Sequence, residues 1–317
     1  MASSAAKFEP APALDHAGSV SPDIYAEWLR RQGQQVVRSA SSYWHSQAMG
    51  VYQAFPYHWL ITPSREELRH LMLDHHAIAL RYSAPAQANF GSTSYHAVYT
   101  ASDYDFEALS AWARKNVRRG LRCCSVGPIS WERYINEGWE LRVDTLARQG
   151  RRLKESRDHW RRRYSAAACL EGFEVWAAEV GGRLGATLVT CRMENWYYLL
   201  YQQCHRDYLR EHVNNALSFI VTQLLIRRPQ VSGIFYGMQS LDAPASVDEF
   251  KFRMGYRALP VRQSVVLHPY VAPLANALSH RLSQALLALD PGSRRLAKAE
   301  GMLRIYLDTA ASMRSNS

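Results

Sequence analysis

The sequence of 317 residues has few cysteines and no long apolar run. The five cysteines are Cys123, Cys124, Cys169, Cys191 and Cys204; their number is odd and none belongs to a C-x-x-C pair. A chain of this length does not need disulfides for stability, so free thiols in a cytoplasmic protein are expected. No apolar run approaches the ~18–20 residues of a membrane span, and the N-terminal residues lack the apolar core of a signal peptide.

Several motifs of enzyme chemistry are also missing. The twelve histidines form no H-E-x-x-H motif and no Cys/His zinc spacing, so no metal site is predicted. Neither a Walker loop nor a G-x-S-x-G elbow occurs, so the sequence does not support nucleotide hydrolysis or serine esterase chemistry. These absences leave reaction classes that need neither a metal nor an activated serine.

Lysine is scarce, with five residues among the 38 lysines and arginines, while the net charge is +10. A GC-rich coding sequence would explain the bias towards arginine. A surface that attracts phosphates or other anions would explain it equally well, and the two explanations are compatible. One of the five lysines, Lys251, lies in the stretch "FKFRMGY", residues 250–256, and the scarcity of lysine favours a specific role for it.

The first half of the chain alternates between helical and strand-like patterns. A disordered lead-in is expected over residues 1–20. The predicted helices are 22–32, 64–73, 105–119 with a stop at Gly120, 129–138 and a long basic helix over 144–164, and the predicted strands are 57–63, 77–83, 94–100, 121–126 and 139–143.

The second half is clearer. The predicted strands are 173–180, 184–192, 196–204, 231–239 and 256–268, with a hairpin at Gly181-Gly182, a helix over 214–228, apolar on most faces, and another over 246–255. Both halves repeat an order of helix, strand, helix and strand. The prediction is an α+β protein with a mixed sheet, divided into a first unit (21–143), a basic connecting helix (144–165), a second unit (166–270) and peripheral C-terminal helices (271–317).

The second unit resembles the GNAT acyltransferase fold, in which three meandering strands precede a buried helix, a strand, a helix and a last strand. The "FKFRMGY" stretch is similar to the GNAT pattern that closes the penultimate helix, with Phe250, Gly255 and Tyr256 at matching positions. Lys251 stands where many GNAT enzymes have the tyrosine that protonates the departing thiolate.

That lysine makes the chain similar to the Fem-type peptidoglycan-bridge aminoacyltransferases, which carry two tandem GNAT-like units. "ARKNVRRG" resembles the basic helix of their first unit, and "VDTLARQGRR", with Asp144, Thr145 and Arg148, resembles the segment that opens their second unit. The resemblance covers residues 75 to 268. It implies an N-acyltransferase whose acceptor is an amine, such as a nucleotide-linked sugar or a cell-envelope precursor.

The resemblance leaves two donors open, an acyl-CoA such as acetyl-CoA, or an aminoacyl-tRNA, each as a co-substrate and not as a tightly bound cofactor. The GNAT pyrophosphate loop should lie at "REHVNNAL", where Arg210 and Ala216 fit but both glycines are missing. Fem-type enzymes lack this loop too, which favours tRNA. Because the coiled-coil hairpin of some Fem proteins is also absent, the prediction leans towards acyl-CoA.

The predicted site centres on Lys251, whose ammonium would stabilise the leaving group between two parted strands. Tyr236 is a catalytic candidate, with core packing as its other interpretation. Gln239, Arg210, Asn214 and Asn215 are predicted to contact the donor, and one of the two asparagines is expected to cap the central helix. Glu174 and Glu179 are given no role.

The basic segment supports a second hypothesis. Between Arg148 and Arg163 it carries eight basic residues and few acidic ones. Arg148 and Arg151, with Thr145, are predicted to contact a phosphorylated acceptor. The alternative is a GNAT-like module without catalysis that binds RNA or a phosphorylated polymer through this segment.

Overall fold

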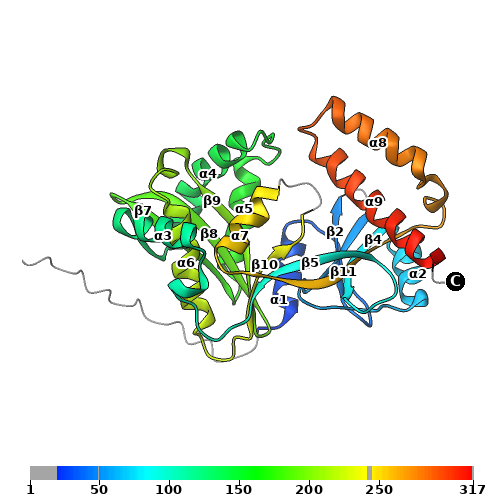
Figure 1. Cartoon of the computed structure of the whole chain (residues 1–317), viewed down its shortest axis with the longest axis horizontal. Coiled ribbons are helices and arrows are strands. Elements are labelled where there is room, and N and C mark those ends of the chain that lie inside the picture. The colour runs from blue at the N-terminus through cyan, green and yellow to red at the C-terminus, as the bar shows by residue number, and fades with distance from the viewer. Residues whose placement is uncertain (1–19, 49, 241–244, 316–317) are drawn as a thin grey trace, which may run out of the picture.

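The computed structural model describes residues 20–48, 50–240 and 245–315 (Figure 1). The predicted disordered lead-in therefore lies outside the described residues, except for Val20, which forms a β-bridge with Glu194.

One mixed sheet of eleven strands runs through the described part of the molecule. Its spatial order is β1-β2-β3-β4-β11-β5-β10-β9-β8-β7-β6. The strands are β1 (Val36–Arg38), β2 (Tyr43–Ala48), β3 (Val51–Phe55), β4 (Ala79–Pro85), β5 (Ser92–Tyr99), β6 (Ser125–Pro128), β7 (Phe173–Val180), β8 (Arg183–Met193), β9 (Trp196–Cys204), β10 (Gly233–Met238) and β11 (Arg257–Leu267).

Helices cover both faces of the sheet. They are α1 (Pro22–Arg31), α2 (Arg65–Asp74), α3 (Ala111–Cys123), α4 (Trp131–Arg148), α5 (Arg157–Ala168), α6 (Val213–Ile226), α7 (Ala245–Arg253), α8 (Ala277–Leu289) and α9 (Arg294–Ser315), with short 3₁₀ turns η1 (Phe106–Ala108), η2 (Arg206–Tyr208) and η3 (Ala272–Leu274). The predicted α+β class is confirmed, and α8 and α9 form the predicted peripheral C-terminal pair (Figure 1).

The two halves of the chain exchange a strand. β11 pairs with both β4 and β5, and β5 pairs with both β11 and β10. Each half also contains one parallel pair, β3–β4 and β9–β10, beside antiparallel neighbours. The two halves therefore form two strand sets that share the centre of one sheet. The predicted repeat of helix, strand, helix and strand is not complete in the first half, because residues 139–143 belong to α4. The unit boundaries along the chain stay predictions, because the strands of the two halves interleave.

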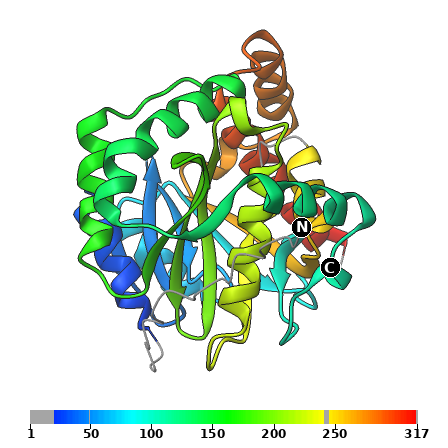
Figure 2. The ribbon, with the colours of Figure 1, turned by 90° about the vertical axis from the view of Figure 1, so that its left-hand side faces the viewer.

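The β7–β9 region is packed on both faces, which explains why β8 is buried from Leu184 to Met193. Trp176 and Leu188 point into a core shared with α3 and α6. Val175 and Val189 point the other way, against Trp160 of α5 and its neighbours. Figure 2 shows α3 and α6 on one side of these strands and α1, α4 and α5 on the other. This layer fixes where α6 begins, next to the strand ends discussed below.

Several local predictions are wrong. Residues 57–63 are not a strand, and β1, β2 and β3 were not predicted. The segments 121–124 and 139–143, predicted as strands, belong mostly to α3 and α4, where apolar residues recur every three or four positions. Gly120 does not stop its helix: it lies inside α3, where an added Cβ would come within 2.6 Å of the His212 carbonyl oxygen of α6.

The predicted basic helix over 144–165 is two helices. α4 ends at Arg148 and Gly150 follows with φ +64°, a backbone conformation that favours glycine. α5 begins after Ser156, whose hydroxyl accepts a hydrogen bond from the His159 amide at 3.1 Å. The basic residues therefore occupy a helix end, a connection and a second helix.

A row of buried polar side chains crosses the centre of the sheet. His96 of β5 is fully buried, and its Nε2 lies 2.8 Å from the Ser83 hydroxyl. Burial, with His58 and Arg81 nearby, lowers the pKa of His96 to about 3. The folded protein therefore holds this ring neutral over a range where an unfolded chain would protonate it.

Replacing His96 by glutamine is expected to flatten the acid dependence of stability. An unfolded histidine binds a proton near pH 6.5, so the stability due to the neutral ring is present above that pH and is lost as the pH falls. Between pH 6 and 4 the free energy of unfolding of the parent protein should fall by about 1.4 kcal/mol per pH unit more than that of H96Q. Urea unfolding at several pH values measures this. H70Q, at an exposed histidine, is the control, and equal slopes in parent and H96Q would contradict the prediction.

Candidate active site where strands β9 and β10 part

The parallel strands β9 and β10 pair over only part of their length. The register joins Gly233, Ile234 and Phe235 to Trp196, Tyr197 and Tyr198. Beyond this point β9 continues to Cys204 on β8, while β10 has a bulge against β5 between Phe235 and Gly237. The sequence-based prediction of two strands that part at this position agrees with this register, and the side chains around the opening are those of Tyr236, Gln202 and Lys251.

Lys251 lies against β10 at this opening. Its side chain is buried, and its Nζ is 2.7 Å from Asp248 Oδ1, one helical turn earlier in α7. The Nζ is also 5.5 Å from the centre of the Tyr236 ring. A Cβ placed on Gly237 would be 3.7 Å from it. Lys251 is therefore not a solvent-exposed surface lysine, while its catalytic role stays a prediction.

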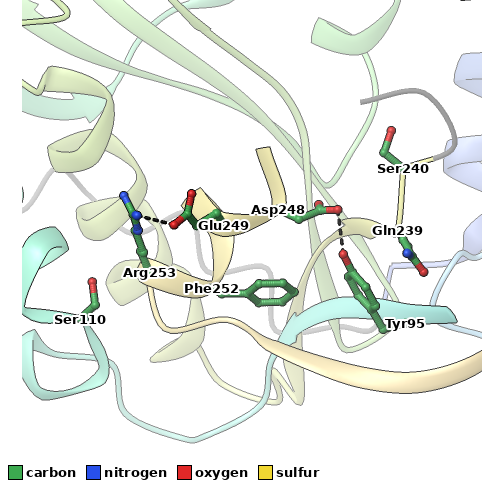
Figure 3. A pocket seen from close by; sticks show the side chains of 8 residues that line it. All are labelled: Tyr95, Ser110, Gln239, Ser240, Asp248, Glu249, Phe252 and Arg253. Carbon is green, nitrogen blue, oxygen red and sulfur yellow. Dashed lines mark hydrogen bonds and ion pairs between the residues drawn. The ribbon is translucent and has the colours of Figure 1, made fainter. Parts of the chain in front are cut away.

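Asp248 connects Lys251 to strand β5. The Tyr95 hydroxyl donates to Asp248 Oδ2 at 2.8 Å (Figure 3). Burial and this bond to the carboxylate raise the pKa of Tyr95 to about 12, so the phenol keeps its proton at neutral pH. Neither residue was singled out in the sequence. The i, i+3 spacing of Asp248 and Lys251 on a helix could have predicted their ion pair. Tyr95 lies 153 positions from Asp248 along the chain, so no local pattern could have predicted their contact.

An open cleft of about 650 Å³ lies on the outer side of this pair. We call it the α7 cleft. Asp248 lines it, whereas Lys251, the ion-pair partner of Asp248, does not. Glu249 and Arg253 form an ion pair on one wall, and Phe252 packs on Tyr95 with ring centres 5.5 Å apart (Figure 3). Its lining residues are Tyr95, Ser110, Gln239, Ser240, Asp248, Glu249, Phe252 and Arg253.

Tyr236 belongs to a hydrogen-bond network that reaches α6. Its hydroxyl donates to Gln202 Oε1. The Gln202 amide nitrogen lies 2.9 Å from Asn214 Oδ1 and 2.6 Å from Ser218 Oγ. Burial raises the pKa of Tyr236, which therefore stays neutral. The structure thus connects three predicted residues, Lys251, Tyr236 and Asn214, around one strand opening.

The start of α6 differs from the prediction. His212 is the N-cap residue, with φ +56°, and makes no side-chain capping bond, so neither asparagine caps the helix. Asn215 is buried, and its amide nitrogen lies 3.7 Å from the Met254 sulfur. Arg210 is exposed just before the helix. Gln239 does not lie at this helix start but beside β5. Its backbone amide donates to the Tyr95 carbonyl oxygen, and its side-chain oxygen accepts a hydrogen bond from the Ser94 hydroxyl at 3.0 Å.

Two of the three predicted acceptor residues, Thr145 and Arg148, lie near Cys204 at the end of β9. The Thr145 hydroxyl donates to the Cys204 carbonyl oxygen at 3.1 Å and accepts from its amide at 3.2 Å. Arg148 is exposed at the end of α4. Burial raises the pKa of the Cys204 thiol to about 12, and the nearby charge of Arg148 offsets part of this increase. Arg151 is half-buried in the following connection. Thr145 therefore has a structural role at least.

The two glutamates left without a role are both ion-paired. Glu174 forms a two-armed pair with Arg228, one contact of which is 2.9 Å, and Glu179 lies 2.9 Å from Arg133 Nη1. These pairs use the carboxylates in the structure of the sheet and its helices, which agrees with assigning neither of them to the site.

No cluster of three or more histidine, cysteine, aspartate or glutamate side chains suited to a metal occurs among the described residues. Within the same residues, no helix combines the length and apolarity needed to cross a bilayer.

Comparison with known proteins rests on structure. No protein-family model and no curated protein matches the sequence. Among solved structures, the chain is similar to FemX, with TM-score 0.54, 10% identity and coverage of 79% of this chain and 93% of that one.

Two further structures are similar at the same level. One is the C-terminal domain of a presumed lysylphosphatidylglycerol synthetase from Agrobacterium fabrum, with TM-score 0.52, 14% identity and coverage of 86% of this chain and 94% of that one. The other is a conserved protein of unknown function from Bacteroides thetaiotaomicron, with TM-score 0.51, 12% identity and coverage of 79% and 92%. The predicted resemblance to Fem-type proteins is thereby confirmed for the fold.

Proposed function

We propose that this protein is a cytoplasmic N-acyltransferase that moves an acyl or aminoacyl group from an activated donor to an amine. One observation carries the proposal: the ammonium of Lys251 is buried beside the opening between β9 and β10 and is fixed by Asp248. The likeness of the fold to FemX adds support for the general class.

The chemistry follows from this geometry. The amine nitrogen of the acceptor forms a bond to the donor carbonyl carbon, and the bond from that carbon to sulfur or to a ribose oxygen breaks. The amine loses one proton and the leaving group gains one. Lys251 would stabilise the negative charge on the departing atom, which is the step where a fixed cation in a buried site is most effective.

Tyr236 is better suited to holding Lys251 than to moving protons. Its hydroxyl is engaged with Gln202, and its ring lies beside the lysine ammonium at a distance typical of a cation–π contact. We therefore assign Tyr236 as a positioning residue in the proposed reaction.

The donor phosphates are proposed to lie at the start of α6. Helix N-termini favour anions, and two arginines lie near this one. Burial and the charge of Arg119 lower the pKa of His212, the N-cap residue, and Arg210 precedes the helix. The donor is an acyl-CoA or an aminoacyl-tRNA, which share this phosphate chemistry. The acceptor is an amine such as a nucleotide-linked sugar or a cell-envelope precursor.

The proposal is tested by ligand protection and by transfer of label. Purified protein is heated with coenzyme A, a nucleotide sugar or tRNA, and then incubated with labelled acetyl-CoA or charged tRNA and a panel of amino sugars. The expected results are a raised melting temperature with one donor-type ligand and labelled amide product with the matching donor. No protection and no product with any combination would overturn the proposal.

A module that binds RNA without catalysis is the second candidate. Six basic residues of the basic segment are exposed, namely Arg148, Arg152, Lys154, Arg157, Arg161 and Arg162. In the same experiment this candidate gives protection by tRNA that weakens steeply with salt, with no product from any donor.

A further inference from the structure

A second, smaller cavity lies next to the α7 cleft, under helix α9. It has a volume of about 60 Å³. We call it the Arg81 cavity, and its lining residues are Arg81, Ser92, Thr93, Ser94, Gln239, Ser240, Gln263, Arg304 and Ile305. Gln239 and Ser240 line both cavities, so the two are adjacent.

Strand register gathers the polar floor of this cavity on one face of the sheet. Gln263 of β11 stands opposite Ser83 of β4 and opposite Ser92 of β5. Arg81 lies two positions before Ser83 on β4, and Ser94 lies two positions after Ser92 on β5. Because successive side chains of a strand alternate between the faces, residues two positions apart lie on the same face. Three strands, the segment after β10 and α9 thus bring these side chains together from distant parts of the chain.

The floor is buried and its geometry is fixed by hydrogen bonds. Arg81, Gln263 and Ser94 are each 9% exposed or less. Arg81 Nε donates to Gln263 Oε1 at 3.1 Å, and the Gln263 amide nitrogen donates to Ser83 at 2.5 Å. The Ser94 hydroxyl donates to Gln239 Oε1 at 3.0 Å.

Two guanidinium groups, from Arg81 and Arg304, line the cavity. No acidic residue belongs to its described lining. Arg304 reaches it from α9 with a half-exposed side chain that also lies 3.5 Å from Glu300. Asp308, one turn further along α9, accepts a hydrogen bond from Ser92 at 3.2 Å at the edge of this region.

We propose that the Arg81 cavity binds an oxyanion, a carboxylate or a phosphate monoester, carried by the acceptor whose amine enters through the α7 cleft. Guanidinium groups with nearby hydroxyls and amides match the oxygens of such a group. The volume corresponds to about two water molecules, at roughly 30 Å³ each, which suits a small anionic group and excludes a sugar ring or a base.

The assignment to the acceptor rests on the proposed function, whereas the binding of the anion does not. It makes Arg304 and Arg81 specificity-determining residues: an amine without an anionic group would be a poor acceptor. The two cavities adjoin at Gln239 and Ser240, and the proposal places one acceptor molecule across both.

Arg304→Gln tests the anion site, because this half-exposed side chain can be changed without disturbing the core. The probes are inorganic phosphate, followed by ³¹P NMR line broadening, and acetate, followed by saturation-transfer NMR, each titrated into the full chain in a chloride buffer. Arg295→Gln, at an exposed position of the same helix about 13 Å away at 1.5 Å per residue, is the matched control for charge.

We expect saturable binding of at least one probe to the parent protein and to R295Q, and binding weakened about tenfold or more in R304Q. The probe that binds more tightly identifies the anion as phosphate or carboxylate. Equal binding to R304Q and R295Q, or no saturable binding to the parent, would overturn the proposal. Since this measurement needs no turnover, a failed transfer assay with intact R304-dependent anion binding would refute the proposed function alone.

Discussion

Replacing Lys251 by alanine is expected to lower the rate of acyl transfer by about 100-fold or more, with little change in KM. The reason is that the ammonium stabilises charge that appears only as the bond to the leaving group breaks, so its loss is felt in the transition state. Steady-state kinetics with saturating donor measures this. Lys154→Ala, at an exposed lysine in the α4–α5 connection, is the control and should retain full activity.

A structural role for Lys251 would give a similar loss for a different reason, because K251A leaves the Asp248 carboxylate buried beside Tyr95 without its cation. The double variant D248N/K251A separates the two explanations, since it removes the uncompensated charge as well. We expect it to recover thermal stability relative to K251A and to remain inactive. Recovery of activity in the double variant would show that Lys251 only balances Asp248.

Replacing Gly255 by alanine is expected to lower the free energy of unfolding by about 2–6 kcal/mol. Gly255 has φ +87°, which costs a non-glycine residue about 1–3 kcal/mol. An added Cβ would also lie 2.6 Å from the Ala108 carbonyl oxygen, and moving a packed backbone aside costs a further 1–3 kcal/mol or so. Urea unfolding gives the value.

Gly182→Ala is the matched control for this change. Gly182 has φ +78° in the β7–β8 hairpin, and its added Cβ meets no atom within 4 Å. Only the conformational cost applies there, about 1–2 kcal/mol. If the two alanine variants lose the same stability, the contact with Ala108 does not constrain the end of α7.

Gly255 also helps to fix the position of the Lys251 backbone in the "FKFRMGY" stretch. The Tyr256 amide donates to the Lys251 carbonyl oxygen at 3.2 Å, and the Gly255 amide donates to that of Phe252 at 3.0 Å. These two bonds are those of a Schellman ending, which needs the left-handed glycine. The same ending that stops the helix therefore fixes the backbone of Lys251, so G255A should also lower the transfer rate.

Elements with a complete local signal were predicted correctly. The buried helix α6, the Gly181-Gly182 hairpin and the three strands around it carry long apolar patterns and turn residues whose meaning does not depend on distant partners. The first half lacks such signals. The short strands β1 to β3 are rich in polar and aromatic residues, and their pairing across the sheet, not their own pattern, makes them strands.

Only part of the site could be predicted from the sequence, for the same reason. Tyr236 belongs to strand β10 and Lys251 to the motif of helix α7, and the two lie close together in the sequence. Their partners Tyr95 and Gln202 lie elsewhere in the chain, on strands whose order in the sheet no local pattern specifies. The Arg81 cavity could not be predicted from the sequence, because its residues come mainly from β4, β5, β11 and α9, which lie far apart along the chain.

The sequence by itself determined the class of fold, the α6 and α7 segments and the lysine at the end of the second unit, because these follow from periodicity and glycine placement within a few turns of chain. Only the tertiary structure decided that β5 and β11 exchange places at the centre of the sheet. That exchange sets Tyr95 on Asp248 and Gln263 beside Arg81, because contacts between strands depend on register over more than 150 residues of chain, where loop closure leaves no local trace.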